Sequence, residues 1–180
     1  SRAMYRNDVA VKEFNDVVGS YGQSKVAPLA LLELGLLYVN EEKYSEAITT
    51  FERLEAAYPS SEAAIHGSYE KGAAYQARGE LEKARMQFQS VAEKNKGSLY
   101  GDKSLVGVGL VAQAKDDYPT ALGAFTDVAS RRTDVVGAEA QYRIGECLYG
   151  EFKYKDAVSA LLRVKYIYPS AKDWIARSYL

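Results

Sequence analysis

Few side chains in this chain could carry catalysis or hold a metal ion. His66 is the one histidine and Cys147 the one cysteine among 180 residues. Zinc sites draw on several histidine, cysteine or carboxylate ligands at set spacings, and no such partner accompanies His66. Cys147 stands two residues after Gly145 in a segment with helical periodicity, which favours a small buried hydrophobic residue over a nucleophile.

Two short motifs that could bind phosphate or act as acids have simpler structural explanations. Gly107 and Gly109 form a Gly-x-Gly, but the surrounding pattern is helical and no strand precedes it, which excludes a phosphate loop. Asp116 and Asp117 fit a turn followed by a helix cap. With 24 acidic residues in the chain, a pair of carboxylates indicates nothing about glycosidase chemistry. We therefore expect a protein that is not an enzyme and has no catalytic residue, cofactor or metal ion.

Charge and hydropathy limit the kinds of partner. The net charge of −1 argues against nucleic-acid binding, which needs a basic stripe to displace the counterions of phosphate. The longest apolar run, residues 27–37, contains Glu33 and is shorter than the ~20 residues that cross a bilayer, so we expect no direct membrane insertion. A single cysteine fits the cytosol and is compatible with the periplasm.

The elements that must position any functional group recur along the chain. An alanine followed four residues later by an aromatic or large apolar residue repeats at intervals of 37, 37, 37 and 36 residues: Ala10/Phe14, Ala47/Phe51, Ala84/Phe88, Ala121/Phe125 and Ala157/Leu161. A glycine keeps the same period, at Gly35, Gly72, Gly109 and Gly145. A period in the 20–50 residue range is typical of solenoids, in which each unit buries its apolar face against its neighbours.

Each period contains two amphipathic helical patterns joined by a short polar break. In the best-preserved unit, residues 31–38 form one apolar stripe and residues 44–54 the next. Tyr58-Pro59 ends the second helix, and Ser60-Ser61-Glu62 offers caps for the one that follows. We expect the recurring glycines to let the two helices of a unit approach closely, with the recurring alanines facing them. The recurring phenylalanines would fill the gap toward the next unit.

The residues of this unit resemble the tetratricopeptide repeat. The motif is carried by Leu34-Gly35, Tyr38, Ala47, Phe51, the apolar residue near Leu54, and Pro59. The resemblance implies an all-α fold, a right-handed α-solenoid of antiparallel helix pairs. The period exceeds the usual 34 residues, and the later units depart from the motif, with Lys71 in the leucine position and Ala112 in the tyrosine position.

A finer similarity concerns the ends of the units. Tyr58-Pro59-Ser60-Ser61-Glu62-Ala63 and Tyr168-Pro169-Ser170-Ala171 resemble the unit ends of bacterial cell-envelope tetratricopeptide proteins, of the outer-membrane assembly lipoprotein and Tol–Pal-associated types. This similarity favours the periplasm or cell envelope slightly over the cytoplasm.

We expect one solenoid segment over residues 1–180. It would hold a partial unit at 1–24, full units at 25–61, 62–98, 99–134 and 135–170, and the start of a further helix at 171–180. Residues 4–18 match only the second helix of a unit, and residues 174–180 only the beginning of a first helix. Both ends therefore appear cut within a unit, as in a piece of a longer array.

By the same resemblance, the first helices line a concave groove that binds a protein or peptide. Counting from the Leu-Gly pair places Leu29, Leu32 and Leu36 in the groove, followed by His66, Tyr69, Gln76, Lys103, Leu110, Gln113, Glu139, Tyr142, Glu146 and Tyr149. This mixed apolar, aromatic and amide surface suits an extended peptide or a partner helix.

Alternatives remain at this point. Tyr69 and Tyr142 could simply pack against adjacent helices, and the three leucines could be covered by a preceding helix. The chain could also be a structural segment that associates with itself through its open ends.

Overall fold

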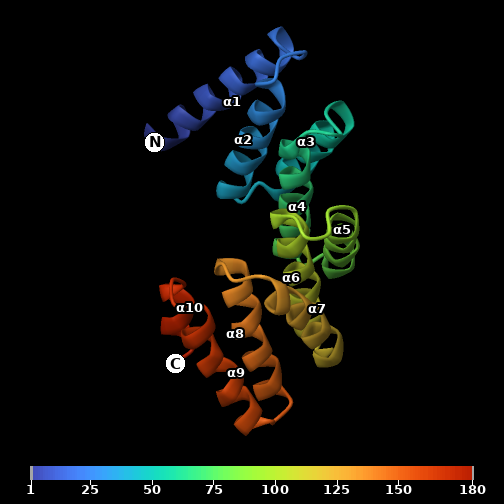
Figure 1. The fold of residues 1–180 in the computed structure, drawn as a ribbon. Helices are drawn as coiled ribbons and strands as arrows, with labels where there is room; N and C mark the ends of the chain where they lie inside the picture. The colour runs from blue at the N-terminus through green and yellow to red at the C-terminus, as the bar shows by residue number, and fades with distance from the viewer. Residues whose placement is uncertain (1, 180) are drawn as a thin grey trace. The chain divides into compact units, whose positions relative to one another are not determined.

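The fold was analysed in a computed structural model, which describes residues 2–179, with side chains from Val9 onward. Every regular element in these residues is a helix, ten in all, and they include no strand, so the predicted all-α class is confirmed. The chain divides into two compact units, Ser1–Val91 and Ala92–Leu180, each described by itself (Figure 1).

In the first unit, α1 packs against α2, α2 against α3 and α3 against α4, and α2 also contacts α4. This is the pattern expected when hairpins stack, because the first helix of one hairpin touches the first helix of the following one. The helices are α1 (Arg2–Ser20), α2 (Ala27–Asn40), α3 (Tyr44–Ala57), α4 (Glu62–Ala77) and the start of α5 (Leu81–Lys94).

The second unit repeats this arrangement. Neighbouring helices pack in chain order, α6 also contacts α8, and the short last helix contacts both α8 and α9. The helices are α6 (Leu99–Gln113), α7 (Tyr118–Arg131), α8 (Val135–Gly150), α9 (Tyr154–Ile167) and α10 (Lys172–Arg177).

The helix boundaries have local causes in the sequence. The helix α3 ends one residue before Tyr58-Pro59, where proline disfavours helical backbone in the residue before it. Ser61 caps α4 by accepting a hydrogen bond from the Ala64 amide, as the sequence predicted. Asp117 caps α7 in the same way, and Pro119 lies in the first turn of that helix, where a missing N–H costs nothing.

The turn inside each hairpin places one residue in the left-handed region. These residues are Glu42, Gly79, Asp116 and Phe152, with φ of 57°, 76°, 59° and 60°. Glycine adopts this conformation freely, and aspartate does so more readily than most residues. A bulky phenylalanine is unfavourable there, so the last turn is the strained member of the set.

The recurring glycines do make room at the helix contact, and a large side chain of the second helix fills the space, an aromatic ring at the first three glycines and Leu161 at Gly145. A Cβ added at Gly72 would lie 2.6 Å from the ring of Phe88, and the ring of Phe51 occupies the same place beside Gly35. The Ala157 carbonyl lies 3.5 Å from a Cβ built at Gly145, and the facing of alanine and glycine in the other hairpins stays a prediction. In the first unit, Phe51 also lies 3.1 Å from a Cβ built at Gly67 on α4, so this ring reaches the next hairpin as predicted.

Lys71 stands in the leucine position of the repeat and is buried, with 8% exposure. Its ammonium lies 2.5 Å from a carboxylate oxygen of Glu55 on α3, and Ser68 donates to the other oxygen of that carboxylate. A buried ammonium is tolerated only when paired in this way. The departure of Lys71 from the repeat motif is thus balanced by the carboxylate of Glu55.

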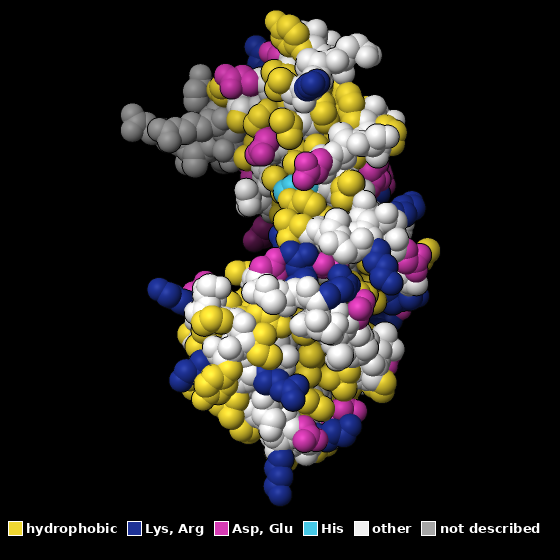
Figure 2. All heavy atoms as spheres, viewed as in Figure 1, with side chains coloured by type: hydrophobic (Ala, Val, Ile, Leu, Met, Phe, Trp, Pro, Cys, Tyr) yellow, Lys and Arg dark blue, Asp and Glu magenta, His cyan; other side chains and the backbone are white. Residues whose placement is uncertain are grey.

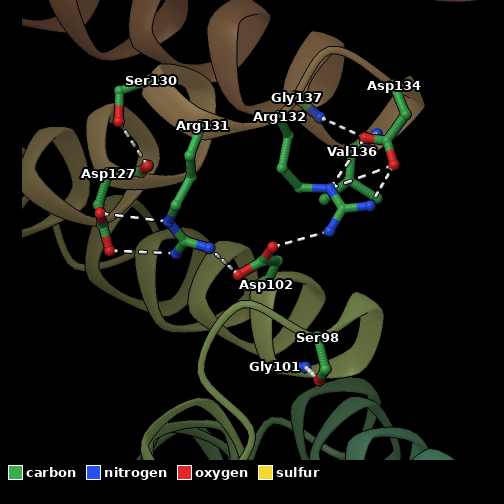
Figure 3. Close-up of polar contacts among 10 residues, drawn as sticks. All are labelled: Ser98, Gly101, Asp102, Asp127, Ser130, Arg131, Arg132, Asp134, Val136 and Gly137. Carbon is green, nitrogen blue, oxygen red and sulfur yellow. Dashed lines mark hydrogen bonds and ion pairs between the residues drawn. The ribbon is translucent and has the colours of Figure 1, made fainter.

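A second buried charge, Asp102 on α6, is held at the corner where α7 ends and α8 begins. Its side chain is 2% exposed, and its two oxygens accept hydrogen bonds from the guanidinium groups of Arg131 and Arg132, the latter at 2.8 Å (Figure 3). Arg131 also pairs with Asp127 at 3.2 Å, and Arg132 pairs with Asp134. Every charge in this cluster therefore has an opposite charge beside it.

Asp134 also caps α8. It accepts hydrogen bonds from the amides of Val136 at 3.1 Å and Gly137 at 3.3 Å. The hydrogen bond from Arg132 and these amides together lower the pKa of Asp134 from 3.8 to about 2.

The corresponding corner one repeat later contains no ion pair. There Tyr168, 1% exposed, packs against Ala138 and Ala171, and its hydroxyl donates to the carbonyl of Ala129 at 3.0 Å. In the first unit, Tyr58 makes the equivalent hydrogen bond to the carbonyl of Gly22 at 2.6 Å.

Candidate partner-binding face

The groove residues predicted in the first unit serve mainly the fold. Leu32 is 6% exposed and belongs to a core cluster with Phe51, and Leu36 packs partly buried against that cluster. His66 lies 3.1 Å from a carboxylate oxygen of Glu70 one turn further along its own helix. The Tyr69 ring packs on Phe88, with 5.8 Å between ring centroids.

The remaining leucine and the amide of this unit are more accessible. Leu29 is 53% exposed at the start of α2, and Gln76, near the end of α4, is partly exposed. The structure thus leaves these two predicted residues available to solvent, at opposite ends of successive first helices.

In the second unit, several predicted residues come together through an arginine. Arg143 on α8 donates to Glu146 at 2.8 Å and lies 3.8 Å from Glu139 one turn earlier. Gln113, at the end of α6, donates to the same oxygen of Glu146 at 3.3 Å. Two carboxylates, one guanidinium and one amide therefore form a network that joins α6 to α8.

Aromatic rings border this network. The rings of Tyr142 on α8 and Trp174 on α10 are 5.4 Å apart and tilted by 43°. The Arg143 guanidinium lies 5.8 Å from the first ring and 5.7 Å from the second, and Arg177 lies 5.0 Å from the indole. Such cation–π contacts hold the rings and guanidinium groups in one arrangement. We call Gln113, Glu139, Tyr142, Arg143, Glu146 and Trp174 the Tyr142–Trp174 face.

Burial shapes the electrostatics of this face. It raises the pKa of Glu139, while the charges of Arg143, Lys103 and Arg177 oppose that rise. Burial also raises the pKa of Tyr142, and the neighbouring charge of Glu146 adds to the effect. Burial therefore destabilises the ionised form of Glu139, and the positive charges on three helices offset part of this destabilisation.

The remaining predicted residues lie outside this network. Leu110 packs against the core of the second unit. The Lys103 ammonium lies 5.5 Å from the Tyr100 ring, and its charge lowers the pKa of Glu139. Tyr149 is 65% exposed, and its ring contacts Tyr154 at the α8–α9 turn.

Sequence reasoning missed Arg143, Trp174 and Arg177. The spacing around Arg143 carried a usable signal, because Glu139 lies four residues before it and Glu146 three residues after it on one helix face. Trp174 and Arg177 come from α10, and the repeat pattern alone gave no position for their side chains.

Nothing in the described residues suggests catalysis or metal binding. Cys147 is fully buried in the core, as predicted, and burial raises the pKa of its thiol to about 12. No group of three or more candidate metal ligands occurs among the side chains of residues 9–179, which the structure describes. Within the same range, no helix is long and apolar enough to cross a membrane.

Two family models, both described as tetratricopeptide repeat, match residues 29–61 and residues 109–172. The chain carries tetratricopeptide repeats. The similarity seen in Leu34-Gly35 and Phe51 is confirmed, and the second match runs from the end of α6 through α7, α8 and α9 to the first residue of α10.

Solved structures of repeat proteins share the fold at low sequence identity. MamA from Desulfovibrio magneticus RS-1 is 16% identical with a TM-score of 0.69, covering 92% of this chain and 89% of that one. A putative kinesin light chain from Podosopora anserina is 15% identical with a TM-score of 0.68, covering 92% and 94%. BtubC from P. vanneervenii is 11% identical with a TM-score of 0.77, covering 92% and 74%.

At these identities the comparisons show the fold alone, an all-helical solenoid of helix pairs. No curated protein matches by sequence. The expected similarity to cell-envelope repeat proteins gains no support from these matches, so the assignment stays at the level of the repeat.

Proposed function

We propose that this chain is a non-enzymatic scaffold for protein–protein interaction and that the Tyr142–Trp174 face binds a peptide or protein partner. The observation that carries the proposal is the convergence of Tyr142, Trp174 and Arg143 beside the partly buried Glu139. The tetratricopeptide fold supports the class of function, because such repeats generally act by binding proteins.

The chemistry of this face suits a peptide side chain rather than a small charged ligand. Aromatic rings and arginine are the residues that most often dominate binding energy at protein interfaces. The rings are already held by cation–π contacts, so little side-chain freedom remains to be lost when a partner binds. Glu139 adds a carboxylate that a basic side chain of the partner would neutralise.

The test starts from peptides selected for binding to the whole chain from a random library. Titration calorimetry then compares the wild type with the Tyr142→Ala and Trp174→Ala variants. Each truncation should lower the affinity for the selected peptides at least about tenfold, which corresponds to ~1.4 kcal/mol of binding free energy. Circular dichroism checks that the helices remain.

Tyr69→Ala provides the matched control, because Tyr69 occupies the groove position of α4 but packs on Phe88. It should lower the stability of the fold and leave peptide affinity unchanged. The proposal fails if selected peptides bind both the Tyr142→Ala and Trp174→Ala variants as tightly as the wild type. The alternative of self-association through the ends stays a prediction, for which sedimentation at several concentrations is the measurement.

A further inference from the structure

Four large apolar side chains form an exposed row along α9. Tyr154, Val158, Leu162 and Tyr166 follow one another at intervals of four residues and are 52%, 57%, 45% and 74% exposed. We call these four residues the α9 row. It extends about 18 Å at the helical rise of ~1.5 Å per residue. Figure 2 shows hydrophobic side chains gathered over α8 and α9, with Lys and Arg between them.

The other second helices of the repeats lack this row. At the position of Leu162, they carry Glu52, Gln89 and Thr126. At the position of Tyr166, they carry the small or polar residues Ala56, Glu93 and Ser130. All six of these residues are exposed, including those on α3 and α7, which have a further helix pair packed after them.

Stacking of hairpins does not explain the second half of the row. At the position of Val158, α5 carries Arg85, α3 carries Ile48, which is 6% exposed, and α7 carries Leu122, which packs against a core cluster. A following helix pair thus covers the second position of the row. The third and fourth positions stay in solvent even in those stacked repeats, so apolar Leu162 and Tyr166 require another occupant.

Positive charges accompany the row at both ends. Lys155 follows Tyr154, and Lys165 precedes Tyr166, with its ammonium 5.8 Å from the Tyr166 ring. Arg163 stands beside Leu162, while Asp156 is the one acidic residue of α9. The surface around the row is therefore basic.

The strained turn before α9 extends this apolar surface. Phe152 is 77% exposed at φ of 60°, in the place that Glu42, Gly79 and Asp116 take in the other hairpins. Its ring contacts Tyr154 edge-on at 6.3 Å. A solvent-exposed aromatic ring on unfavourable backbone gains nothing from the fold, and such strain is concentrated at functional positions.

We propose that the α9 row, continued by Phe152, docks an amphipathic helix of another protein whose apolar stripe is flanked by carboxylates. Residues at i±4 form the ridges that interdigitate between packed helices, and the row is one such ridge. Carboxylates on the partner would pair with Lys155 and Lys165, which gives the charge complementarity of a specific interface. This surface is separate from the Tyr142–Trp174 face, so the two proposals can fail independently.

One other occupant fits the charges less well, and a second is separated by its shape. A second copy pairing its row antiparallel with this one would bring Lys155 opposite Lys165, and like charges across an interface are unfavourable. An anionic membrane would attract the same lysines, but it has no ridges of side chains that could interdigitate with the row.

The test uses synthetic helical peptides of about eighteen residues, or five turns, with a leucine stripe flanked by glutamates. A peptide with lysines in place of the glutamates and a scrambled peptide serve as probe controls. The whole chain should bind the glutamate peptide at least about tenfold more tightly than either control, with an affinity that falls as salt rises. Fluorescence anisotropy measures the affinities.

The variant Leu162→Glu should weaken the glutamate peptide at least about tenfold, because it puts a charge in the centre of the apolar row. Thr126→Glu, at the same position of α7, is the matched control and should leave the affinity unchanged. Lys155→Glu with Lys165→Glu should weaken binding and remove most of its salt dependence. Leu162 is exposed, so circular dichroism should show these variants folded.

Phe152→Gly gives a readout that separates binding from stability. Relief of the left-handed strain should raise Tm by about 2–4 °C, while binding of the glutamate peptide weakens. Three outcomes overturn the proposal. The lysine or scrambled peptide binds as well as the glutamate peptide; vesicles with 30% anionic lipid bind the wild type and release Leu162→Glu; or sedimentation shows a dimer that Leu162→Glu dissolves.

Discussion

Two successive corners of the second unit occupy the same place in the repeat and are filled by different chemistry. At one corner, buried Asp102 on α6 is held by Arg131 and Arg132. At the other, thirty-six residues further on, Ala138 on α8 lies under Tyr168. In each corner, the residue on the first helix and the residue after the second helix are thirty positions apart. Both members of the pair differ between the two corners.

The difference shows that the repeat creates a space of similar position at each corner, which either an ion pair or an aromatic ring can fill. The tyrosine corner gains by burying a ring and by one hydrogen bond to the Ala129 carbonyl. The charged corner gains little by comparison, because the cost of taking Asp102 out of water offsets much of its attraction to the arginines. We therefore expect the tyrosine corner to be the more stabilising of the two.

Tyr168→Ala should have the largest effect. Removal of a ring that is 1% exposed leaves a cavity and an unpaired carbonyl, which costs about 3–5 kcal/mol of unfolding free energy. Urea unfolding followed by circular dichroism measures the loss. Tyr166→Ala, at a ring that is 74% exposed, is the matched control and should change stability by less than about 0.5 kcal/mol. Equal losses in the two variants would contradict the comparison.

Asp102→Ala should destabilise by about 2 kcal/mol, less than the usual cost of breaking a buried pair, because the arginines keep Asp127 and Asp134. Adding Arg132→Tyr to this variant copies the Ala138–Tyr168 corner. The double variant should recover the lost stability, since apolar replacement of buried ions is often neutral or favourable. A double variant less stable than Asp102→Ala alone would show that the corners are not interchangeable.

The smallest effect concerns acid stability. Because the pKa of Asp134 is lowered to about 2, its ionised form stabilises the fold above its ordinary pKa of 3.8, and this contribution is lost as pH falls toward 2. Asp134→Asn keeps a side chain able to cap α8 and removes the charge. At pH 5 the free energy of unfolding of the wild type should exceed that of this variant by about 1 kcal/mol. The value is small because the ion pair between Arg132 and Asp134 is partly exposed to solvent.

The difference between wild type and Asp134→Asn should shrink toward pH 2. Denaturant unfolding at each pH gives the two curves. A difference that stays constant with pH would assign the effect of Asp134 to capping rather than to its charge. Burial raises the pKa of the Tyr168 phenol above its ordinary value of 10, so this side chain stays neutral below pH 5 and a Tyr168→Phe variant should show no such change over this range.

Much of the fold could be read from local chemistry. Tyr58-Pro59, Ser61 and Asp117 set helix boundaries through backbone preference and capping, which depend only on neighbouring residues. The glycine period also indicated a close approach, although the ring of Phe51, rather than Ala47, is the group that fills it. Which side chain fills the space beside the glycine depends on how the two helices are oriented toward each other, and the apolar pattern of one helix does not specify that orientation.

The candidate site was recovered in part for a similar reason. Counting along α6 and α8 placed Gln113, Glu139 and Glu146 on surfaces that do meet. Trp174 was missed because α10 falls outside the full repeats and its contact with Tyr142 is made across space.

The corner pairs were missed as well, because Asp102 and Arg132 are too far apart in sequence for a helical pattern to link them. Comparison of residue pairs thirty positions apart between successive repeats, Asp102 and Arg132 with Ala138 and Tyr168, would have revealed the exchange.

The contact between a glycine and a phenylalanine ring closes inside each of the first three complete hairpins, as with Gly72 on α4 and Phe88 on α5. The glycine and the phenylalanine of each contact therefore stay in the same segment when one period of the chain is copied, deleted or moved. Recombination between equivalent turns would keep each of these glycine–phenylalanine contacts, so repeats could be gained or lost without new packing inside a hairpin. Pairs such as Asp102 and Arg132 also lie within one period. A repeat could therefore exchange its corner interaction while the rest of the array is preserved.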